Sequence, residues 1–340
     1  MRPSLFVVVP SLFVVTVLVL SGCGVGYGDE DTVRVYSGRH YDLEQAFGAF
    51  AEQTGISVEF LYGGDAELRE RIKAEGEDTP ADVYLTVDAG NLWQAGQEGL
   101  LAPLASPALR DAVPEGLRDP QGRWYGLSMR VRTVMYNPER VDPSEFDTTN
   151  TYAGLADPKW NGRLCMRNST NTYTQSLVAS LIEEHGYDRA RQIVRGWVDN
   201  DVAITNNDVR ILENVDAGGC DVAIANHYYL ARLLDENPDL SVRPFWANQD
   251  GRGVHVNISG AGVLANADHP ELARRLIEWL ATTGQNSFVD GNHEFPVNPD
   301  VEPEPLIAGF GDFEYQPINA EAYGARNADA VRLMREAGYQ

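Results

Sequence analysis

The sequence predicts an α/β protein built of two lobes. A β-α-β-α-β order of elements occupies residues 33–87, and this order is typical of a parallel sheet. The same rhythm restarts near Asn161. About 310 residues follow the N-terminal leader, a length that suits two lobes of ordinary domain size better than one core.

In the first lobe, a strand at 33–36 is followed by a helix that Asp42 caps and Gly55 ends. The helix repeats its apolar residues at helical spacing. The next elements are expected to be a strand at 56–62, a helix at 66–75 and a strand at 82–87.

A second α/β unit is predicted after Asn161. Its expected elements are a strand at 162–166, helices from Thr174 and Tyr187, a strand at 202–205, a helix from Asp208, a strand at 221–225 and a helix at 229–236. A β-rich passage at 254–264 and an amphipathic helix at 270–280 are interpreted as the return into the first lobe.

The N-terminus reads as an export signal that covers residues 1–22. An apolar run extends from Leu5 to Leu20. A transmembrane anchor is the alternative, but roughly 16 apolar residues are short for a span. The sequence Leu-Ser-Gly-Cys that ends at Cys23 resembles a bacterial lipobox, which implies cleavage before Cys23 and acylation of its thiol. Residues 23–31 would then form a short tether at a membrane surface.

The composition is strongly acidic. Acidic residues outnumber basic ones by 50 to 27, so nucleic acid is excluded as an expected partner and a cation would be attracted. After the leader, no other segment is apolar enough to span a membrane.

Two cysteines remain once Cys23 is assigned to lipid. In an oxidising compartment Cys165 and Cys220 can pair as a disulfide. Two buried free thiols are the alternative, because spacing alone does not establish the geometry of a bridge. A two-cysteine metal site is a further, weaker reading.

Three tyrosine-bearing segments each follow a predicted strand and precede a predicted helix. They contain His40 and Tyr41, Tyr173, and the pair Tyr228 and Tyr229. Ligands of open parallel sheets gather outside the carboxyl ends of the strands, so these side chains are expected to converge on one cleft.

A hard, highly charged cation suits such a set of side chains. A phenolate is an anionic oxygen donor, and its reference pKa near 10 means that only a strongly polarising ion removes the proton at neutral pH. Ferric iron fits this requirement. Magnesium or calcium would call for carboxylates, and zinc for histidine and cysteine.

Five stretches of the sequence together resemble the periplasmic ferric-iron-binding proteins of ABC transporters. They are the residues 35–41, 82–92, 221–230, 256–263 and 295–299. The resemblance implies a type II periplasmic binding protein similar to transferrin lobes, with each lobe a mixed sheet flanked by helices. The first lobe would occupy 32–130 and the second 131–257, with 258–340 returning to the first lobe and adding C-terminal helices.

The resemblance also implies a ligand set for iron. The first lobe would contribute His40 and Tyr41, and the second lobe Tyr173, Tyr228 and Tyr229. Other subclasses add an acidic ligand and a synergistic anion. No acidic ligand is placed here, so binding of an anion stays open. The implied partners are an ABC permease and ferric iron, free or as a chelate, for a lipid-anchored monomer.

Each of these residues also has a simpler reading. The tyrosines are also suited to stacking on a sugar. His40 could hydrogen-bond the backbone instead of a metal, and His227 reads as structural. Arg130 and Arg132 lie two apart and could offset phenolate charge or hold an anion, or could be surface cations.

Two other functions stay open beside iron capture. The first is binding of another solute, such as a sugar, a polyamine or an oxyanion, by the same fold. The second is a tyrosine-ligated iron enzyme. No haem-attachment motif, nucleophile elbow, HExxH or phosphate loop in context supports catalysis, so a transport role rather than an enzyme is predicted.

Overall fold

The fold is taken from a computed structural model, which describes residues 31–39, 44–316 and 320–340. The predicted leader, Cys23, His40, Tyr41 and Asp42 lie outside the described residues. Within the described part, no helix combines the length and apolar character that a membrane span needs.

One mixed sheet runs through the whole molecule. Among the described residues it has ten strands, and its main order is β2-β1-β3-β9-β4-β7-β5-β6, with β8 and β10 pairing to β4. The strands are β1 (Thr32–Ser37), β2 (Ser57–Tyr62), β3 (Val83–Thr86), β4 (Tyr125–Tyr136), β5 (Leu164–Arg167), β6 (Ala203–Thr205), β7 (Val222–Asn226), β8 (Arg243–Phe245), β9 (His255–Val263) and β10 (Phe295–Pro296).

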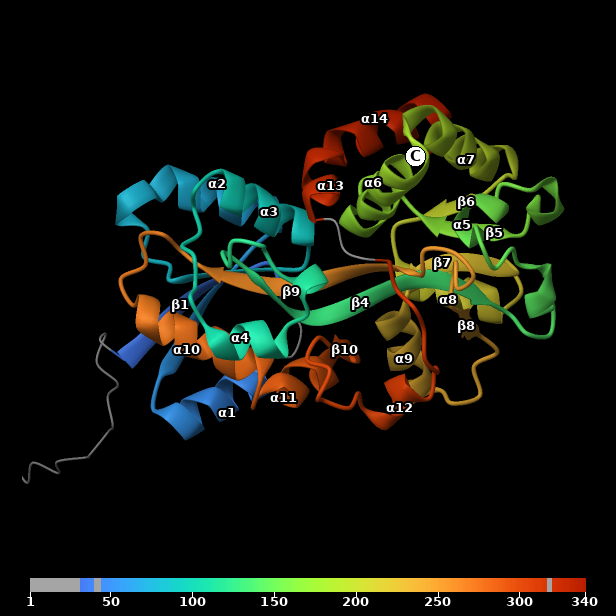
Figure 1. Cartoon of the computed structure of the whole chain (residues 1–340). Helices are drawn as coiled ribbons and strands as arrows, with labels where there is room; N and C mark the ends of the chain where they lie inside the picture. The colour runs from blue at the N-terminus through green and yellow to red at the C-terminus, as the bar shows by residue number, and fades with distance from the viewer. Residues whose placement is uncertain (1–30, 40–43, 317–319) are drawn as a thin grey trace, which may run out of the picture.

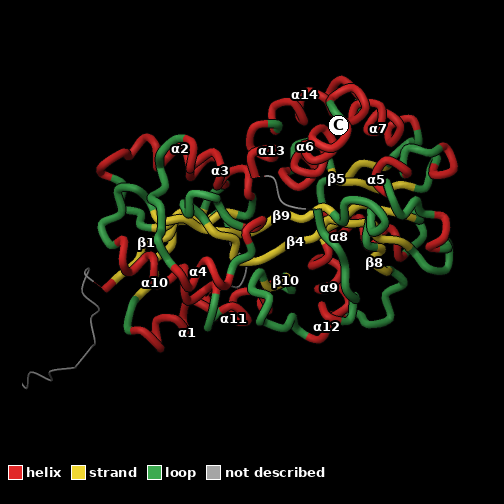
Figure 2. Tube along the Cα trace, in the orientation of Figure 1, coloured by secondary structure: helices red, strands yellow, loops and turns green. Residues whose placement is uncertain are grey.

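Helices flank this sheet in two groups (Figure 1). The helices are α1 (Glu44–Thr54), α2 (Asp65–Glu75), α3 (Ala89–Gln97), α4 (Pro107–Ala112), α5 (Thr151–Gly154), α6 (Thr172–His185), α7 (Tyr187–Asp199), α8 (Asp208–Asp216), α9 (His227–Glu236), α10 (Pro270–Ala281), α11 (Gln285–Val289), α12 (Pro305–Ala308), α13 (Ala320–Ala325) and α14 (Asn327–Ala337). Figure 2 shows α1 to α4, α10 and α11 around one end of the sheet and α5 to α9 around the other.

In each half of the sheet, the outer strands pair in parallel, as the alternation of strands and helices predicts. β1 pairs in parallel with β2 and β3, and β5 pairs in parallel with β6 and β7. The antiparallel strands β4 and β9 lie between these groups, which makes the sheet mixed.

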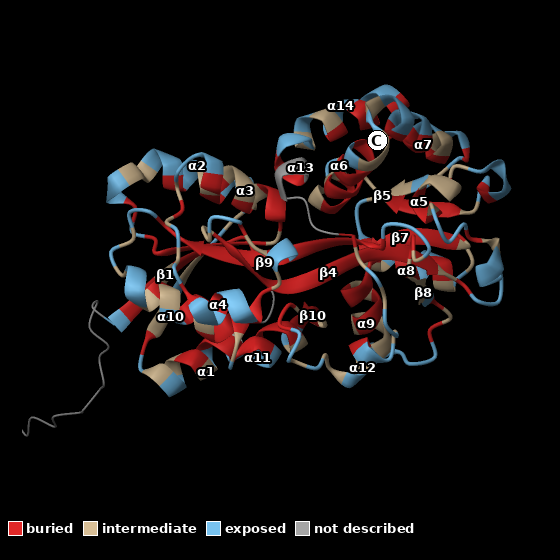
Figure 3. Cartoon of the chain, in the orientation of Figure 1, coloured by how far each residue is buried: buried red, intermediate tan, exposed pale blue. Residues whose placement is uncertain are grey.

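The strands β4 and β9 cross from one half to the other. β9 pairs with β3 through its last residues, and β4 pairs with β7 through 132–136. Both strands are buried almost throughout, and Figure 3 shows this buried band along the middle of the molecule. One continuous sheet therefore runs through both lobes.

The C-terminal region does not return wholly to the first lobe. The predicted amphipathic helix forms α10, which packs against β1 and β9 in the first half. The helix α14 instead packs against α6 and α7 in the second half, and α13 contacts both α3 and α6. The segment after α12 therefore bridges the two lobes.

Candidate metal centre

Tyr173 lies in the first turn of α6, just after β5. The side chain of Asn171 caps this helix by accepting a hydrogen bond from the Tyr173 N–H at 3.0 Å. The cap fixes where the helix begins and so where Tyr173 projects. Tyr173 is buried, and the guanidinium carbon of Arg130 lies 5.1 Å from the centre of its ring.

The pair Tyr228 and Tyr229 occupies the first turn of α9, directly after β7. Tyr228 is completely buried, and its hydroxyl accepts a hydrogen bond from Asn226 Nδ2 at 3.2 Å. The two tyrosine rings lie 4.3 Å apart between centres. Arg232 lies above both rings, at 5.4 and 5.9 Å from their centres. The pair thus lies at the start of a helix that follows a parallel strand, which is the location that the sequence predicts.

A small polar pocket joins these segments at the crossing strands. Its lining residues are Arg130, Arg132, Tyr173, Ser176, Asn226, His255 and Asn257. Its volume of about 10 Å³ corresponds to one water-sized particle. Tyr173 from α6 and Asn226, the partner of Tyr228, therefore face the same space.

Arg130 and Arg132 are interior residues of β4 and not surface cations. They are only 2% and 3% exposed, respectively. The Nη2 of Arg130 donates to the Ile258 carbonyl oxygen at 3.0 Å, and the Nη1 of Arg132 donates to Asp208 Oδ1 at 3.1 Å. Two guanidinium groups thus lie in the wall of the pocket.

Sequence reasoning missed two charged residues that interact with the site, Asp208 through Arg132 and Arg167 through Tyr229. Asp208 is fully buried and forms ion pairs with both Arg132 and Arg167. Burial opposes the charge of Arg167, but Asp208 and then Tyr229 outweigh it, so the pKa of Arg167 is raised. Arg167 ends β5, so the rule that located the tyrosines, looking just after each strand, could also have found it.

Two histidines near the pocket are buried and neutral. Burial lowers the pKa of His227 to about 4 and that of His255 to about 3. His227 Nδ1 accepts the Val131 N–H at 3.1 Å. These contacts fit the structural reading of His227. Among the described residues, no group of three or more His, Cys, Asp and Glu side chains is arranged to hold a metal.

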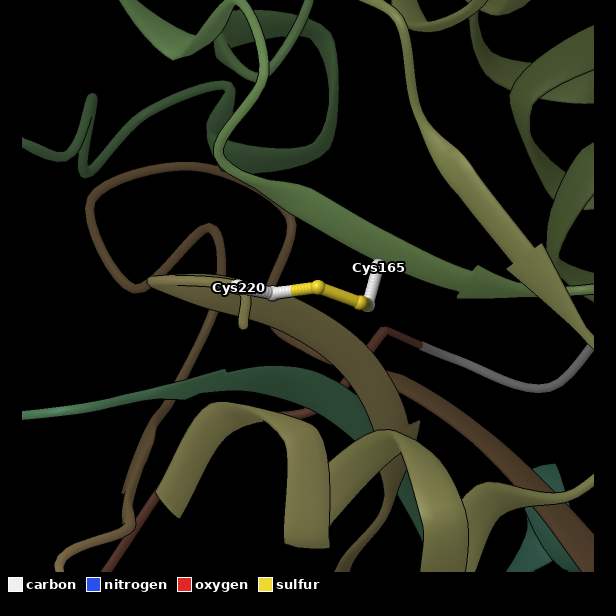
Figure 4. The surroundings of a disulfide bond; sticks show 2 residues. All are labelled: Cys165 and Cys220. Atoms are coloured by element: carbon white, nitrogen blue, oxygen red, sulfur yellow. A yellow bond between two sulfur atoms is a disulfide. The ribbon is translucent and has the colours of Figure 1, made fainter. Parts of the chain in front are cut away.

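Cys165 and Cys220 form a disulfide (Figure 4). Cys165 belongs to β5, and Cys220 precedes β7, which is the parallel neighbour of β5. Their Cα atoms lie 5.9 Å apart. The bond links the chain near the starts of these two strands, and Tyr173 and Tyr228 lie in the helices that follow the strands.

The two-lobed α/β fold, with a polar pocket at the crossing strands, is that of a binding protein. The chain belongs to the bacterial extracellular solute-binding protein family, whose model matches residues 78–307.

Two related proteins match this sequence over most of its length. Iron uptake protein A1 of Synechocystis sp. is 39% identical over 99% of this chain and 98% of that protein. The major ferric iron-binding protein of Neisseria meningitidis is 27% identical, covering 90% of this chain and 92% of that protein.

Two solved structures have the same fold over more than 90% of this chain. A Trichodesmium protein in complex with iron and citrate ligands is 43% identical, with a TM-score of 0.84 over 91% of this chain and all of that one. Apo FutA2 from Synechocystis is 39% identical, with a TM-score of 0.83 over 92% of this chain and all of that one. The relatives named are uptake and binding proteins and not enzymes.

Proposed function

We propose that this chain captures ferric iron in the cleft between its lobes and delivers it to an ABC permease. The observation that carries the proposal is the tyrosine pair at the start of α9, whose Tyr228 hydroxyl hydrogen-bonds Asn226 in the wall of the pocket that Tyr173, Arg130 and Arg132 also line. Phenolates are hard anionic donors, and Fe³⁺ is the hard cation that can hold them ionised near neutral pH. Relatives named for iron uptake support the same cargo.

The proposed ligands are His40 and Tyr41 from the first lobe and Tyr173, Tyr228 and Tyr229 from the second. Four phenolates exceed the charge of Fe³⁺ by one negative charge. We propose that Arg130 and Arg132 offset this excess, because both guanidinium groups are buried in the wall of the pocket that Tyr173 also lines. The same arginines would attract a synergistic anion such as the citrate bound to the Trichodesmium protein.

We further propose that the chain is exported and held at a membrane by lipid on Cys23. The apolar run and the lipobox-like residues before Cys23 support this assignment. Anchoring would keep the loaded protein close to its permease.

Titration of the full chain with ferric citrate, followed by visible absorption, tests iron capture. A saturable one-to-one tyrosinate-to-iron band is expected for wild type, and Tyr228→Phe should lose or strongly shift it. Tyr187→Phe is the matched control, because Tyr187 also begins a helix but hydrogen-bonds Glu336 on α14, away from the pocket. The absence of a wild-type band would refute iron capture and return attention to a sugar, polyamine or oxyanion as the solute.

A further inference from the structure

Arg39 immediately precedes the two proposed ligands of the first lobe, and its side chain is completely buried, at 0% exposure. The backbone around it is also held. The Ser37 hydroxyl donates to the Arg39 carbonyl oxygen at 2.6 Å and accepts the Arg39 N–H at 3.1 Å. The backbone is therefore held in place as far as Arg39.

The guanidinium of Arg39 binds several elements at once. Its Nη1 donates to Ser259 Oγ at 3.0 Å and to Ser128 Oγ at 3.4 Å. Its Nη2 donates to the Phe288 carbonyl oxygen at 2.9 Å, and the group lies 4.2 Å from the centre of the Phe288 ring. A planar fork with five donors makes such a set of contacts, whereas a lysine ammonium does not reproduce them.

Glu294 supplies the opposing charge and is only 1% exposed. It pairs with Arg39 Nη1 and also accepts hydrogen bonds from Ser128 Oγ and Asn292 Nδ2. Burial opposes its ionisation, but Arg39 and then Arg130 outweigh that effect, so the pKa of Glu294 is lowered. The pair is thus a charged, hydrogen-bonded unit in the interior.

The serines place this unit on the two crossing strands. Ser128 belongs to β4 and Ser259 to β9, and the two residues are opposite each other in the register of those strands. Arg39 therefore joins the end of β1 to the part of the sheet that both lobes share.

The second ligand pair is held by a similar arrangement. His227 immediately precedes Tyr228, is fully buried, and accepts the N–H of Val131 on β4 at 3.1 Å. The residue before each proposed ligand pair is thus buried and attached to the same strand, at Ser128 for Arg39 and at Val131 for His227.

We propose that Arg39 is a positioning residue whose buried ion pair with Glu294 fixes the position immediately before the first-lobe ligands to the crossing strands, to which the residue before the tyrosine pair on α9 is also attached. The inference rests on the proposed iron function. A buried ion pair is weak support for stability, since apolar residues of similar volume often replace one without loss. The role of the Arg39–Glu294 pair is therefore to position residues and not to stabilise the fold.

The test measures ferric iron affinity by competition with citrate, the tyrosinate-to-iron absorption band, and the thermal midpoint of the full chain. Arg39→Lys is expected to lower affinity ten- to a hundredfold, the usual effect of losing a group that orients metal ligands, and to shift the band. Arg34→Gln on β1 is the control, because Arg34 pairs with the exposed Glu59. It should bind iron as wild type does.

A double variant separates positioning from stability. Arg39→Met with Glu294→Met removes both charges, so its thermal midpoint should return close to that of wild type while its affinity stays at least about tenfold low. Recovery of affinity together with stability would overturn the proposal, as would wild-type affinity in Arg39→Lys.

If wild type and Arg34→Gln show no band, iron capture itself fails. If they show a band that only Tyr228→Phe loses, iron capture stands and the role of Arg39 fails.

Discussion

Among single residues, Asp65 at the start of α2 has an unusual environment. Its carboxylate accepts hydrogen bonds from the Val87 N–H, at 3.3 and 3.4 Å. A Cβ atom at Gly38 would lie 1.6 Å from its Oδ1, so only glycine fits beside it. Burial and then repulsion from Asp88 raise the pKa of Asp65 to about 7, although Val87 and Arg130 oppose the shift.

The raised pKa of Asp65 makes the folded protein less stable as pH rises. The folded protein holds this proton between the unfolded pKa of 3.8 and the folded pKa of about 7, so the contribution of Asp65 is lost as pH rises through that window. We expect Asp65→Asn to match wild type below pH ~4 and to exceed it by up to about 4 kcal/mol at pH ~8.

Chemical denaturation across this pH range measures the difference. Asp78→Asn, at an exposed position after α2, is the control and should follow wild type throughout. A constant offset between Asp65→Asn and wild type at every pH would contradict the assignment.

At the scale of elements, the disulfide connects two neighbouring strands across a separation of 55 residues. The chain between the cysteines contains α6, α7 and α8, so the bond closes a long loop in the unfolded protein. We expect the double variant Cys165→Ser, Cys220→Ser to lose about 2–4 kcal/mol of unfolding free energy. Denaturation with and without reductant measures this. A wild-type protein that is insensitive to reductant when unfolding would argue against the bond.

The contact between α3 and α13 depends on two glycines. A Cβ atom at Gly324 would lie 2.3 Å from Trp93 Cε3 and 3.0 Å from the Gly90 carbonyl oxygen. We expect Gly324→Ala to cost about 1–3 kcal/mol, because the backbones of the two helices must separate. Gly116→Ala is the control, since no atom lies within 4 Å of its added Cβ. Equal thermal midpoints for the two variants would show that the contact adjusts freely.

For the whole molecule, the two lobes are joined by the crossing strands and by the bridging segment at α13. The proposed ligands come from both lobes, so we expect coordination and closure of the lobes to be one event. We expect the radius of gyration to fall when ferric iron binds, and X-ray scattering in solution measures it. The Tyr228→Phe variant should show no change under the same conditions. Iron binding without compaction would place the metal within one lobe.

Sequence patterns predict most elements because these depend on local spacing. The alternation at 33–87 gives β1, α1, β2, α2 and β3, and 221–225 gives β7 within one residue. The tyrosines were located by one further rule, that ligands gather after parallel strands. The rule places Tyr173 and Tyr228 correctly at helix starts, but it cannot say which helices face one another.

An α/β protein with tyrosines after its strands can be predicted from local patterns, because helix and strand periods and turn residues act over a few neighbours. The single sheet that joins both lobes, the packing of α14 on the second lobe and the contact of Arg39 with Glu294 depend instead on long-range packing. The partners of the Arg39 side chain lie 89 to 255 residues away in the chain. Contacts at that separation arise from the packing of the whole fold and leave no local pattern to read.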